Sequence, residues 1–274
     1  MAHLSERKRD RKAYRLAKKY LLAMKPTQLS EADVEKYLVP RGRKVSLEDI
    51  YKQILQSASN TQMAPRVIKK GIPEWDKLGP VLCNFDPHAV GRKYLSWEGV
   101  FAEIIRKLKP AGKVRRERNS IFPRLCRTIL DGAAFLSRFP NAGGFYRWAE
   151  LFNVEDDDVR LALPTVLHRS ISGLGFALSC DFLKEMGFEH YGKPDTWIIK
   201  EFKALKLSQE DSTPKQVLLD LFRVAKHAGV TAYAVDKVFW LIGSQKFHLH
   251  KNSKGKGSAE DFISYARKEL RHSG

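Results

Sequence analysis

The sequence has few cysteines and no long apolar run. Cys83, Cys126 and Cys180 stand far apart, and an odd count without close spacing argues against a disulfide framework and for a reducing compartment. No stretch approaches the roughly 20 apolar residues that a bilayer-spanning helix needs. The charged residues 6–12 lack the apolar core of a secretion signal. We therefore expect a soluble cytoplasmic protein with no membrane partner, associated with the nucleoid if the source is prokaryotic.

Patterns for metal and nucleotide binding are also missing. Cys83 and His88 are two candidate ligands, whereas a structural zinc ion takes four. Residues 251–257 are basic and glycine-rich but lack the spacing of a P-loop. No group of Asp, Glu and His has the spacing of a two-metal nuclease, so a nuclease is a weak alternative. We expect neither a metal nor an organic cofactor.

Acidic residues are outnumbered, with 31 Asp and Glu against 49 Lys and Arg and a net charge of +18. Basic side chains gain affinity for polyanions chiefly by displacing counterions from phosphates. Nucleic acid is the leading partner, although a ribosome-associated or membrane-surface protein would share this balance. Hydrophobic residues make up 43% of the chain, enough to bury a core in one large or two small domains.

Helical periodicity runs along most of the chain, and no convincing strand alternation interrupts it. Trp97, Val100, Phe101 and Ile104, for example, share one face of a helix. Pro164 is expected at the first position of its own helix, where its missing N–H would have no partner. The pattern predicts an all-α fold with helices over residues 1–25, 30–38, from 46, 121–136, 146–152, 157–163, 164–170, 175–186, 196–205, 214–228, 231–242 and 258–270.

Composition predicts three regions: a basic helical extension (1–70), a helical core (71–250), and a C-terminal basic loop and helix (251–274). The first helix either clamps DNA phosphates or docks its apolar stripe on the core. Residues 56–80 are expected to form an irregular connection. Residues 106–118 are expected to form an exposed basic loop, in which Arg115 and Arg116 either contact phosphates or merely aid solubility.

The most informative segment is Ile-Ser-Gly-Leu-Gly at 171–175, followed by an apolar helix and then Lys-Pro-Asp-Thr-Trp at 193–197. Two glycines allow a tight turn and leave N–H groups at the start of the next helix, where a DNA phosphate is favoured. Asp195 precedes another apolar run, so its carboxylate is expected to cap that helix while facing whatever the hairpin holds. Taken alone, an Asp at this position is usually only a cap.

The segment from Ser172 to Ile198 resembles the helix-hairpin-helix base-excision DNA glycosylases, the HhH-GPD superfamily. Their hairpin reads roughly L-P-G-V-G-x-K-x-A, and their catalytic aspartate lies in a V-D-T-H stretch. Residues 173–175 match the hairpin and residues 194–197 match the aspartate segment. Residues 235–243 also resemble a late D-x-x-x-W-x-x-G helix of some members. The resemblance spans residues 95 to 245 in outline and implies a two-lobed helical fold.

The resemblance implies a site as well as a fold. It assigns catalysis to Asp195, and it implies that DNA is held by Ser172, Gly173, Leu174, Gly175 and Lys193. The basic segment adds Arg115 and Arg116 as further candidate contacts. Ala177, eighteen residues before Asp195, stands where bifunctional members carry a Schiff-base lysine. The expected enzyme is therefore monofunctional and leaves an abasic site.

Several positions depart from the family pattern. Ser172 replaces the usual proline, and Trp197 replaces the usual histidine, so the resemblance does not identify the excised base. Lys184 and Lys193 are possible substitutes for the missing lysine, although Lys184 is equally compatible with a solvated helix face. No cysteine follows Cys180, so the iron–sulfur cluster of some members is not expected.

A flipped base needs an aromatic wall, because stacking contributes about 1–3 kcal/mol per base. Aromatic residues at helical spacing are nevertheless more often part of the core. Asp236 lies within an apolar helix and is expected to be a cap or an ion-pair partner rather than a second catalytic group. The candidate base-pocket residues are Tyr146, Trp148, Trp197 and Trp240.

Two functions follow from these patterns. The first is a monomeric DNA glycosylase that acts on a damaged or modified base in double-stranded DNA, in repair or in defence against modified DNA. The second is a noncatalytic helix-hairpin-helix protein that holds DNA or RNA through phosphates, in which Asp195 has no special role.

Overall fold

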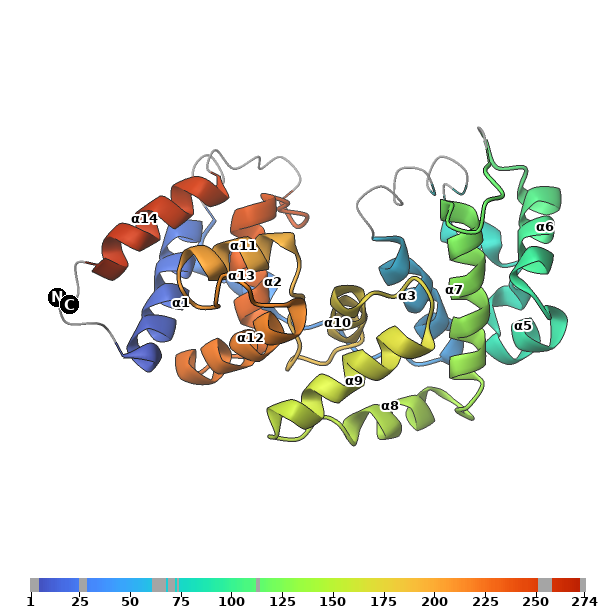
Figure 1. Cartoon of the computed structure of the whole chain (residues 1–274), viewed down its shortest axis with the longest axis horizontal. Helices are drawn as coiled ribbons and strands as arrows, with labels where there is room; N and C mark the ends of the chain where they lie inside the picture. The colour runs from blue at the N-terminus through green and yellow to red at the C-terminus, as the bar shows by residue number, and fades with distance from the viewer. Residues whose placement is uncertain are drawn as a thin grey trace. The chain divides into compact units, whose positions relative to one another are not determined.

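The computed structural model describes residues 5–24, 29–60, 68, 72, 74–111, 114–250 and 258–271. Every regular element in these ranges is an α-helix or a 3-10 helix (Figure 1), which confirms the all-α prediction. None of the described helices is long and apolar enough to cross a membrane. The chain packs as two compact units: Met1–Arg41 with Leu183–Gly274, called here the terminal unit, and Gly42–Phe182, called the central unit.

The terminal unit is built around one almost completely buried helix, α13. This helix packs against α1, α2, α11, α12 and α14. Threonine caps begin two of these helices: Thr231 accepts a hydrogen bond from an amide in the first turn of α13, and Thr213 does the same for α12. The helices of this unit are α1 (Glu6–Ala23), α2 (Glu31–Leu38), α11 (Thr196–Ala204), α12 (Pro214–Ala228), α13 (Ala232–Ser244) and α14 (Ala259–Arg271).

Helix α1 docks its apolar stripe on the terminal unit. Ala13, Ala17 and Leu21 recur at helical spacing and are fully buried, and the helix packs against α12, α13 and α14. Asp10 is buried beside them, where its Oδ2 accepts hydrogen bonds from Arg223 Nε (3.0 Å) and His227 Nδ1 (2.7 Å). Of the two roles expected for this helix, docking on the core is confirmed, and phosphate binding stays a prediction.

The central unit is organised by α7, which packs against α3, α5, α6 and α9. Gly132 allows α7 to approach α3 closely, since a Cβ there would lie 3.2 Å from Cε2 of Tyr51. The Tyr51 hydroxyl donates to the Ile129 carbonyl at 2.6 Å. The elements of this unit are α3 (Leu47–Ser59), η1 (Trp75–Leu78), η2 (Cys83–Phe85), α5 (Pro87–Lys93), α6 (Trp97–Leu108), α7 (Ile121–Leu136), α8 (Ala142–Glu150), α9 (Asp157–Ser170) and most of α10 (Phe176–Glu185).

Three helix assignments differ from the sequence-based expectation. Pro164 does not begin a helix but lies buried inside α9, which runs unbroken from its cap at Asp156 to Ser170. Helix α8 begins before Tyr146, since Asn141 caps the amide of Gly144 at 2.9 Å. Helix α5 was not predicted, although Asp86 at its cap and a proline at its first position are start signals.

The two units divide the chain differently from the boundaries at residues 70 and 250 expected from composition. Helices α1 and α2 pack with the C-terminal helices, whereas α3 packs with α7. Composition shows where charge and residue content change along the chain, but it does not show which apolar helix faces pack together. The expected basic loop 251–257 lies outside the described residues.

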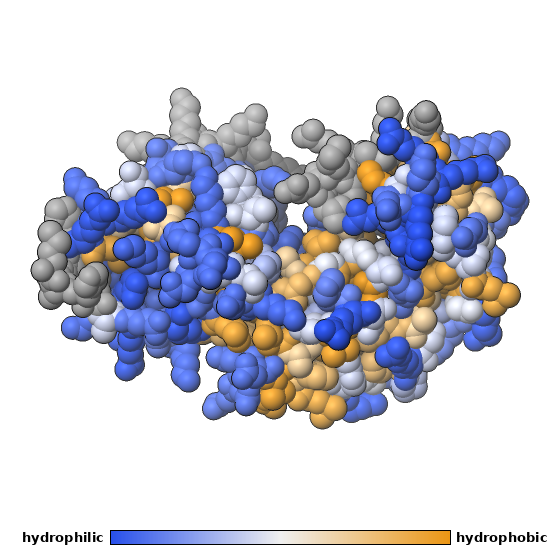
Figure 2. Space-filling model, in the orientation of Figure 1, coloured by the Kyte–Doolittle hydropathy of each residue, from blue (hydrophilic) through white to orange (hydrophobic). Residues whose placement is uncertain are grey.

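The surface is largely polar, as the net charge of +18 requires. Figure 2 shows hydrophilic residues over most of the visible face and apolar residues gathered over α8 and α9, where Leu151, Val154 and Val159 are exposed. The expected basic loop is shorter than predicted, because Arg106 and Lys107 belong to α6 and pair with Glu103. Arg115 and Arg116 lie beyond the helix and are exposed.

Candidate functional site

The glycine hairpin between α9 and α10 is anchored to α7. Gly173 has a φ of +83°, and a Cβ at this position would lie 2.5 Å from Thr128 Oγ1. The Thr128 hydroxyl lies 2.6 Å from the Ser172 carbonyl oxygen, to which it donates. The backbone N–H of Ser172 donates to Asp131 Oδ2 at 2.9 Å. Both the left-handed backbone and the close approach to α7 require glycine at position 173.

Some backbone amides of the hairpin donate hydrogen bonds within the protein, and others have no acceptor among the described residues. The Leu174 amide donates to the Ile171 carbonyl at 3.2 Å, and the Leu174 side chain is fully buried. Within the described part of the chain, the amides of Gly173 and Gly175 donate no hydrogen bond. Asp131 occupies the Ser172 amide, so only the two glycine amides match the expected anion-binding arrangement at the start of a helix.

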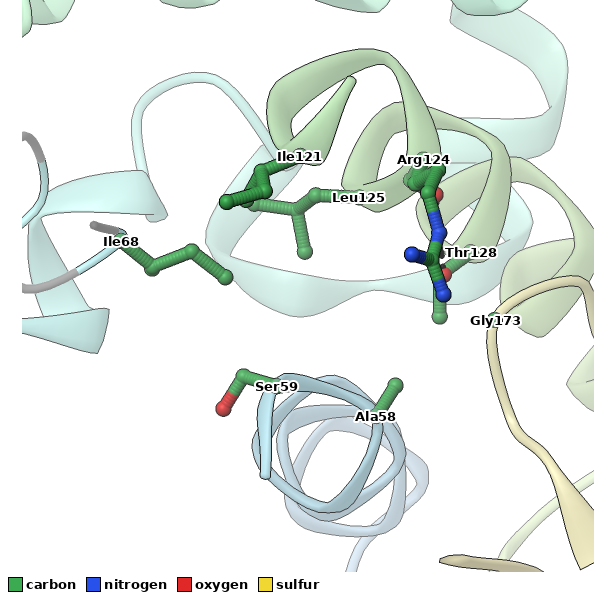
Figure 3. Close-up of a pocket in the computed structure, with 8 residues that line it drawn as sticks. All are labelled: Ala58, Ser59, Ile68, Ile121, Arg124, Leu125, Thr128 and Gly173. Atoms are coloured by element: carbon green, nitrogen blue, oxygen red, sulfur yellow. Dashed lines mark hydrogen bonds between the residues drawn. The ribbon is translucent and has the colours of Figure 1, made fainter. Parts of the chain in front are cut away.

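A shallow pocket in the central unit borders the hairpin (Figure 3). Arg124 and Thr128 lie one turn apart on α7 and line this pocket together with Gly173, opposite Ala58 and Ser59 of α3. Arg124 is exposed, so its guanidinium adds a cation beside the glycine amides. Arg124 was not predicted from the sequence, because nothing in its local pattern shows that this face of α7 meets the hairpin.

Asp195 caps α11 and is held in place by that helix. Its Oδ1 accepts hydrogen bonds from the Trp197 amide (3.0 Å) and the Ile198 amide (3.3 Å). Its Oδ2 makes no hydrogen bond to any described residue. Burial raises the pKa of Asp195 above its ordinary value and the charge of Asp236 adds to this rise, whereas Lys193 opposes it. The cap predicted from the sequence is therefore present, and one carboxylate oxygen is left for another partner.

Asp236 forms a buried ion pair behind Asp195. Its Oδ2 lies 2.6 Å from Lys184 Nζ, and its Oδ1 accepts the Lys193 backbone N–H at 3.2 Å. Gly192 lets the preceding loop pass close to α13, since a Cβ there would lie 3.0 Å from Asp236 Cβ. The expectation that Asp236 is an ion-pair partner is confirmed. Lys184 is buried, so it does not lie on a solvated helix face.

Glu201, on the same helix that Asp195 caps, is fully buried. Neither of its carboxyl oxygens has a hydrogen-bond partner among the described residues. A Cβ on Gly243 would lie 3.1 Å from Glu201 Oε1 and 3.0 Å from Trp197 Cβ, so glycine is needed where α13 meets this pair. Burial raises the pKa of Glu201 well above its ordinary value, and the charge of Asp195 raises it further. Glu201 was not predicted from the sequence, although a Glu among the apolar residues of α11 is a signal.

The four aromatic candidates for a base pocket lie in different units. Trp197 and Trp240 belong to the terminal unit with Asp195; Trp197 is 37% exposed, and Trp240 is half-buried with Lys237 Nζ 5.4 Å from its ring centroid. Tyr146 and Trp148 belong to the central unit.

The two aromatic residues of the central unit take part in packing. The Tyr146 hydroxyl accepts the Lys44 amide at 2.8 Å. Trp148 contacts Phe135, Phe139, Phe145 and Phe152, with ring centroids 5.4 to 6.0 Å apart. Contact between a base and any of the four candidates stays a prediction. In the described residues, no group of three or more His, Cys, Asp or Glu is placed to hold a metal ion.

Comparisons with known proteins add one structural similarity. No protein-family model and no curated protein sequence match the chain. One solved structure is similar: the Methanocaldococcus jannaschii 8-oxoguanine glycosylase/lyase in complex with a 15mer DNA containing 8-oxoguanine. The two share 13% sequence identity with a TM-score of 0.48, over 85% of this chain and 98% of the other.

Proposed function

We propose that this protein is a DNA glycosylase that hydrolyses the N-glycosidic bond of a damaged or modified base in double-stranded DNA. It acts as a monomer and leaves an abasic site, in repair or in defence against DNA that carries modified bases. The observation that carries the proposal is the geometry of Asp195: a half-buried carboxylate fixed by two amides, with its Oδ2 unbonded among the described residues.

Asp195 suits the chemistry of this reaction. Excision requires the base to leave the duplex stack and the sugar to pass through an oxocarbenium-like state. A fixed carboxylate in a dry site stabilises such a cation and orients or deprotonates the attacking water. Oδ1 is occupied by the cap, so Oδ2 is the oxygen that we assign to the sugar and the water.

The amines near Asp195 support hydrolysis rather than Schiff-base chemistry. Position 177 is alanine, and Lys184 is buried and paired with Asp236 at 2.6 Å. An ammonium held by a carboxylate in this way is not available as a nucleophile. These two features favour a monofunctional reaction, and Lys193 is the remaining candidate amine.

The hairpin supports binding of the DNA backbone. The amides of Gly173 and Gly175 lie just before the start of α10, and Arg124 supplies a cation beside them. Phosphate contacts of this kind position the duplex without reading its sequence. Lys193, Arg115 and Arg116 are proposed as further contacts, and the +18 charge favours a polyanionic partner.

The test compares wild-type protein with Asp195→Asn on oligonucleotide duplexes that contain uracil, hypoxanthine, 8-oxoguanine, alkylated purines or modified cytosines. Alkali reveals abasic sites, and mass spectrometry identifies the released base. We expect alkali-dependent breaks with wild type alone and equal DNA binding by both proteins. Breaks without alkali would overturn the monofunctional assignment. Tight binding by both proteins without release of any base would favour the noncatalytic alternative.

A further inference from the structure

Glu201 is a carboxyl group that folding leaves without a partner. It is fully buried, and neither oxygen accepts or donates a hydrogen bond within the described residues. An unpaired ionised carboxylate is very costly in such a place, whereas a neutral carboxylic acid is tolerated. Buried polar groups are nearly always satisfied, so a group that is not satisfied calls for an explanation beyond packing. The neutral acid is therefore the form of Glu201 that this environment favours.

The charged groups around Glu201 favour the same protonation state. Asp195 lies at the head of its own helix, Asp236 lies on α13 and Glu260 on α14, and all three disfavour a negative charge on Glu201. Lys200 is the cation that opposes them, and its ammonium is bonded to Glu260. Burial is the largest cause of the raised pKa of Glu201.

Asp195 and Glu201 are thus two carboxyl groups in contrasting environments. Asp195 is partly accessible, and the two amide hydrogen bonds that it accepts oppose the rise that burial causes in its pKa. Glu201 has neither solvent nor hydrogen bonds among the described residues. Where one of two neighbouring carboxyls is kept neutral and the other ionised, the neutral one is suited to give up a proton and the ionised one to stabilise a cation.

We propose that Glu201 is the general acid of this enzyme, which protonates the departing base while Asp195 stabilises the sugar. This assignment rests on the proposed glycosylase function. The acid is needed for the uncharged bases of DNA, because these bases leave as anions unless they receive a proton. A base that already carries a positive charge needs no such donor.

Trp197 is a neighbour of this acid on α11. Residues 197 and 201 are one turn apart on α11, and both side chains lie against the same point of Gly243. Trp197 is 37% exposed, whereas Glu201 is fully buried. Because Glu201 is fully buried, proton transfer to a base requires the neighbouring Trp197 ring to move, and the proposal gives the indole the role of a face on which the flipped base stacks.

Proton transfer from Glu201 accompanies cleavage of the glycosidic bond. The C1′–N bond breaks and its electron pair stays on the base nitrogen, while the Glu201 proton passes to the base. Water forms the C1′–O bond and gives one proton to Asp195. The products are the neutral free base and an abasic sugar. Transfer of the proton from Asp195 back to Glu201 through solvent restores the starting state.

The experiment compares wild-type protein with Glu201→Gln, an uncharged isostere that cannot act as an acid at neutral pH. Single-turnover release is measured for the uncharged bases hypoxanthine, 8-oxoguanine and uracil, and for 7-methylguanine, which is already cationic in its nucleoside. We expect Glu201→Gln to slow release of an uncharged base by about 10²–10⁴-fold and to leave 7-methylguanine release within a few-fold. Wild-type rates on an uncharged base, or equal losses on both classes, would overturn the acid role and leave the proposed function intact.

A second measurement needs no substrate. The ¹³C carboxyl signal of Glu201, assigned as the one that disappears in Glu201→Gln, is followed from pH 4 to pH 10. A protonated carboxyl at pH 7 is expected, and a carboxylate at that pH would overturn the proposal. If the wild type released no base from any duplex, the proposed function would fail and the acid role with it, whatever the signal showed.

Discussion

The ammonium of Lys184 lies 2.6 Å from Oδ2 of Asp236, and at most 5% of either side chain is exposed. The pair joins residues 52 positions apart and lies behind the loop that carries Asp195. Removal of one partner leaves the other charge buried without compensation, which typically costs about 3–5 kcal/mol. We expect Lys184→Met to lower the free energy of unfolding by that order, measured by urea denaturation. The double variant Lys184→Met/Asp236→Leu should recover much of the loss. A single variant as stable as wild type would contradict the stabilising role given to this ion pair.

Gly173 and Gly175 provide a matched pair of substitutions. Gly173→Ala forces a side chain into a left-handed backbone and places its Cβ 2.5 Å from Thr128 Oγ1. Gly175 has open space around its Cα. We expect Gly173→Ala to cost about 1–3 kcal/mol of stability and to weaken binding to duplex DNA, while Gly175→Ala changes stability little. Thermal denaturation and fluorescence anisotropy measure the two effects. Equal behaviour of both variants would contradict the role given to the hairpin backbone.

Two substitutions of Asp195 separate its capping role from its chemistry. Asn still accepts the Trp197 and Ile198 amides, whereas Ala removes the cap and should cost about 0.5–2 kcal/mol. The pKa of Asp195 is raised in the folded state, so its ionisation lowers stability as pH rises above the ordinary value of 3.8. Asp195→Asn should therefore be at least as stable as wild type at pH 7 and yet inactive. Melting temperatures at pH 7 test this, and an unstable Asn variant would contradict it.

Glu201 should impose a pH dependence on stability. Its pKa is raised above the ordinary value of 4.5 in the folded protein, so the folded state holds the proton more tightly than the unfolded state. Stability is then lost as pH rises from about 4.5 through the folded pKa. We expect Glu201→Gln to match wild type near pH 4.5 and to be increasingly more stable at higher pH. Melting curves from pH 4 to pH 9 measure the difference. A difference that does not change with pH would mean that Glu201 ionises normally.

Arg124 should bind one phosphate of the DNA backbone. Removal of one cation that neutralises a phosphate lowers the slope of log affinity against log salt by about 1. We expect Arg124→Gln to weaken binding to duplex DNA and to reduce the slope by this amount. Lys226→Gln, at an exposed position of α12, serves as the control for net charge. Equal slopes for the two variants would assign the effect to overall charge rather than to the hairpin.

The amino-acid sequence by itself determined the features that depend on neighbouring residues. Asp195 caps α11 as expected, because a cap joins a side chain to amides two or three residues away. Helical periodicity likewise placed most of the helices. The boundaries failed where a start signal was overlooked, as at Asn141 and Asp86.

Only the tertiary structure decided which of these helices pack together and which side chains are buried between them. Arg124 borders the hairpin, Lys184 pairs with Asp236, and Glu201 loses solvent against Gly243, each through contacts between residues far apart in the chain. Desolvation depends on everything packed around a group, so a glutamate that would be an ordinary charge on a helix surface has a raised pKa where α11 meets α13. Spacing along the chain predicts the cap and the hairpin. Packing creates the difference in burial and hydrogen bonding between Asp195 and Glu201, on which the proposed chemistry depends.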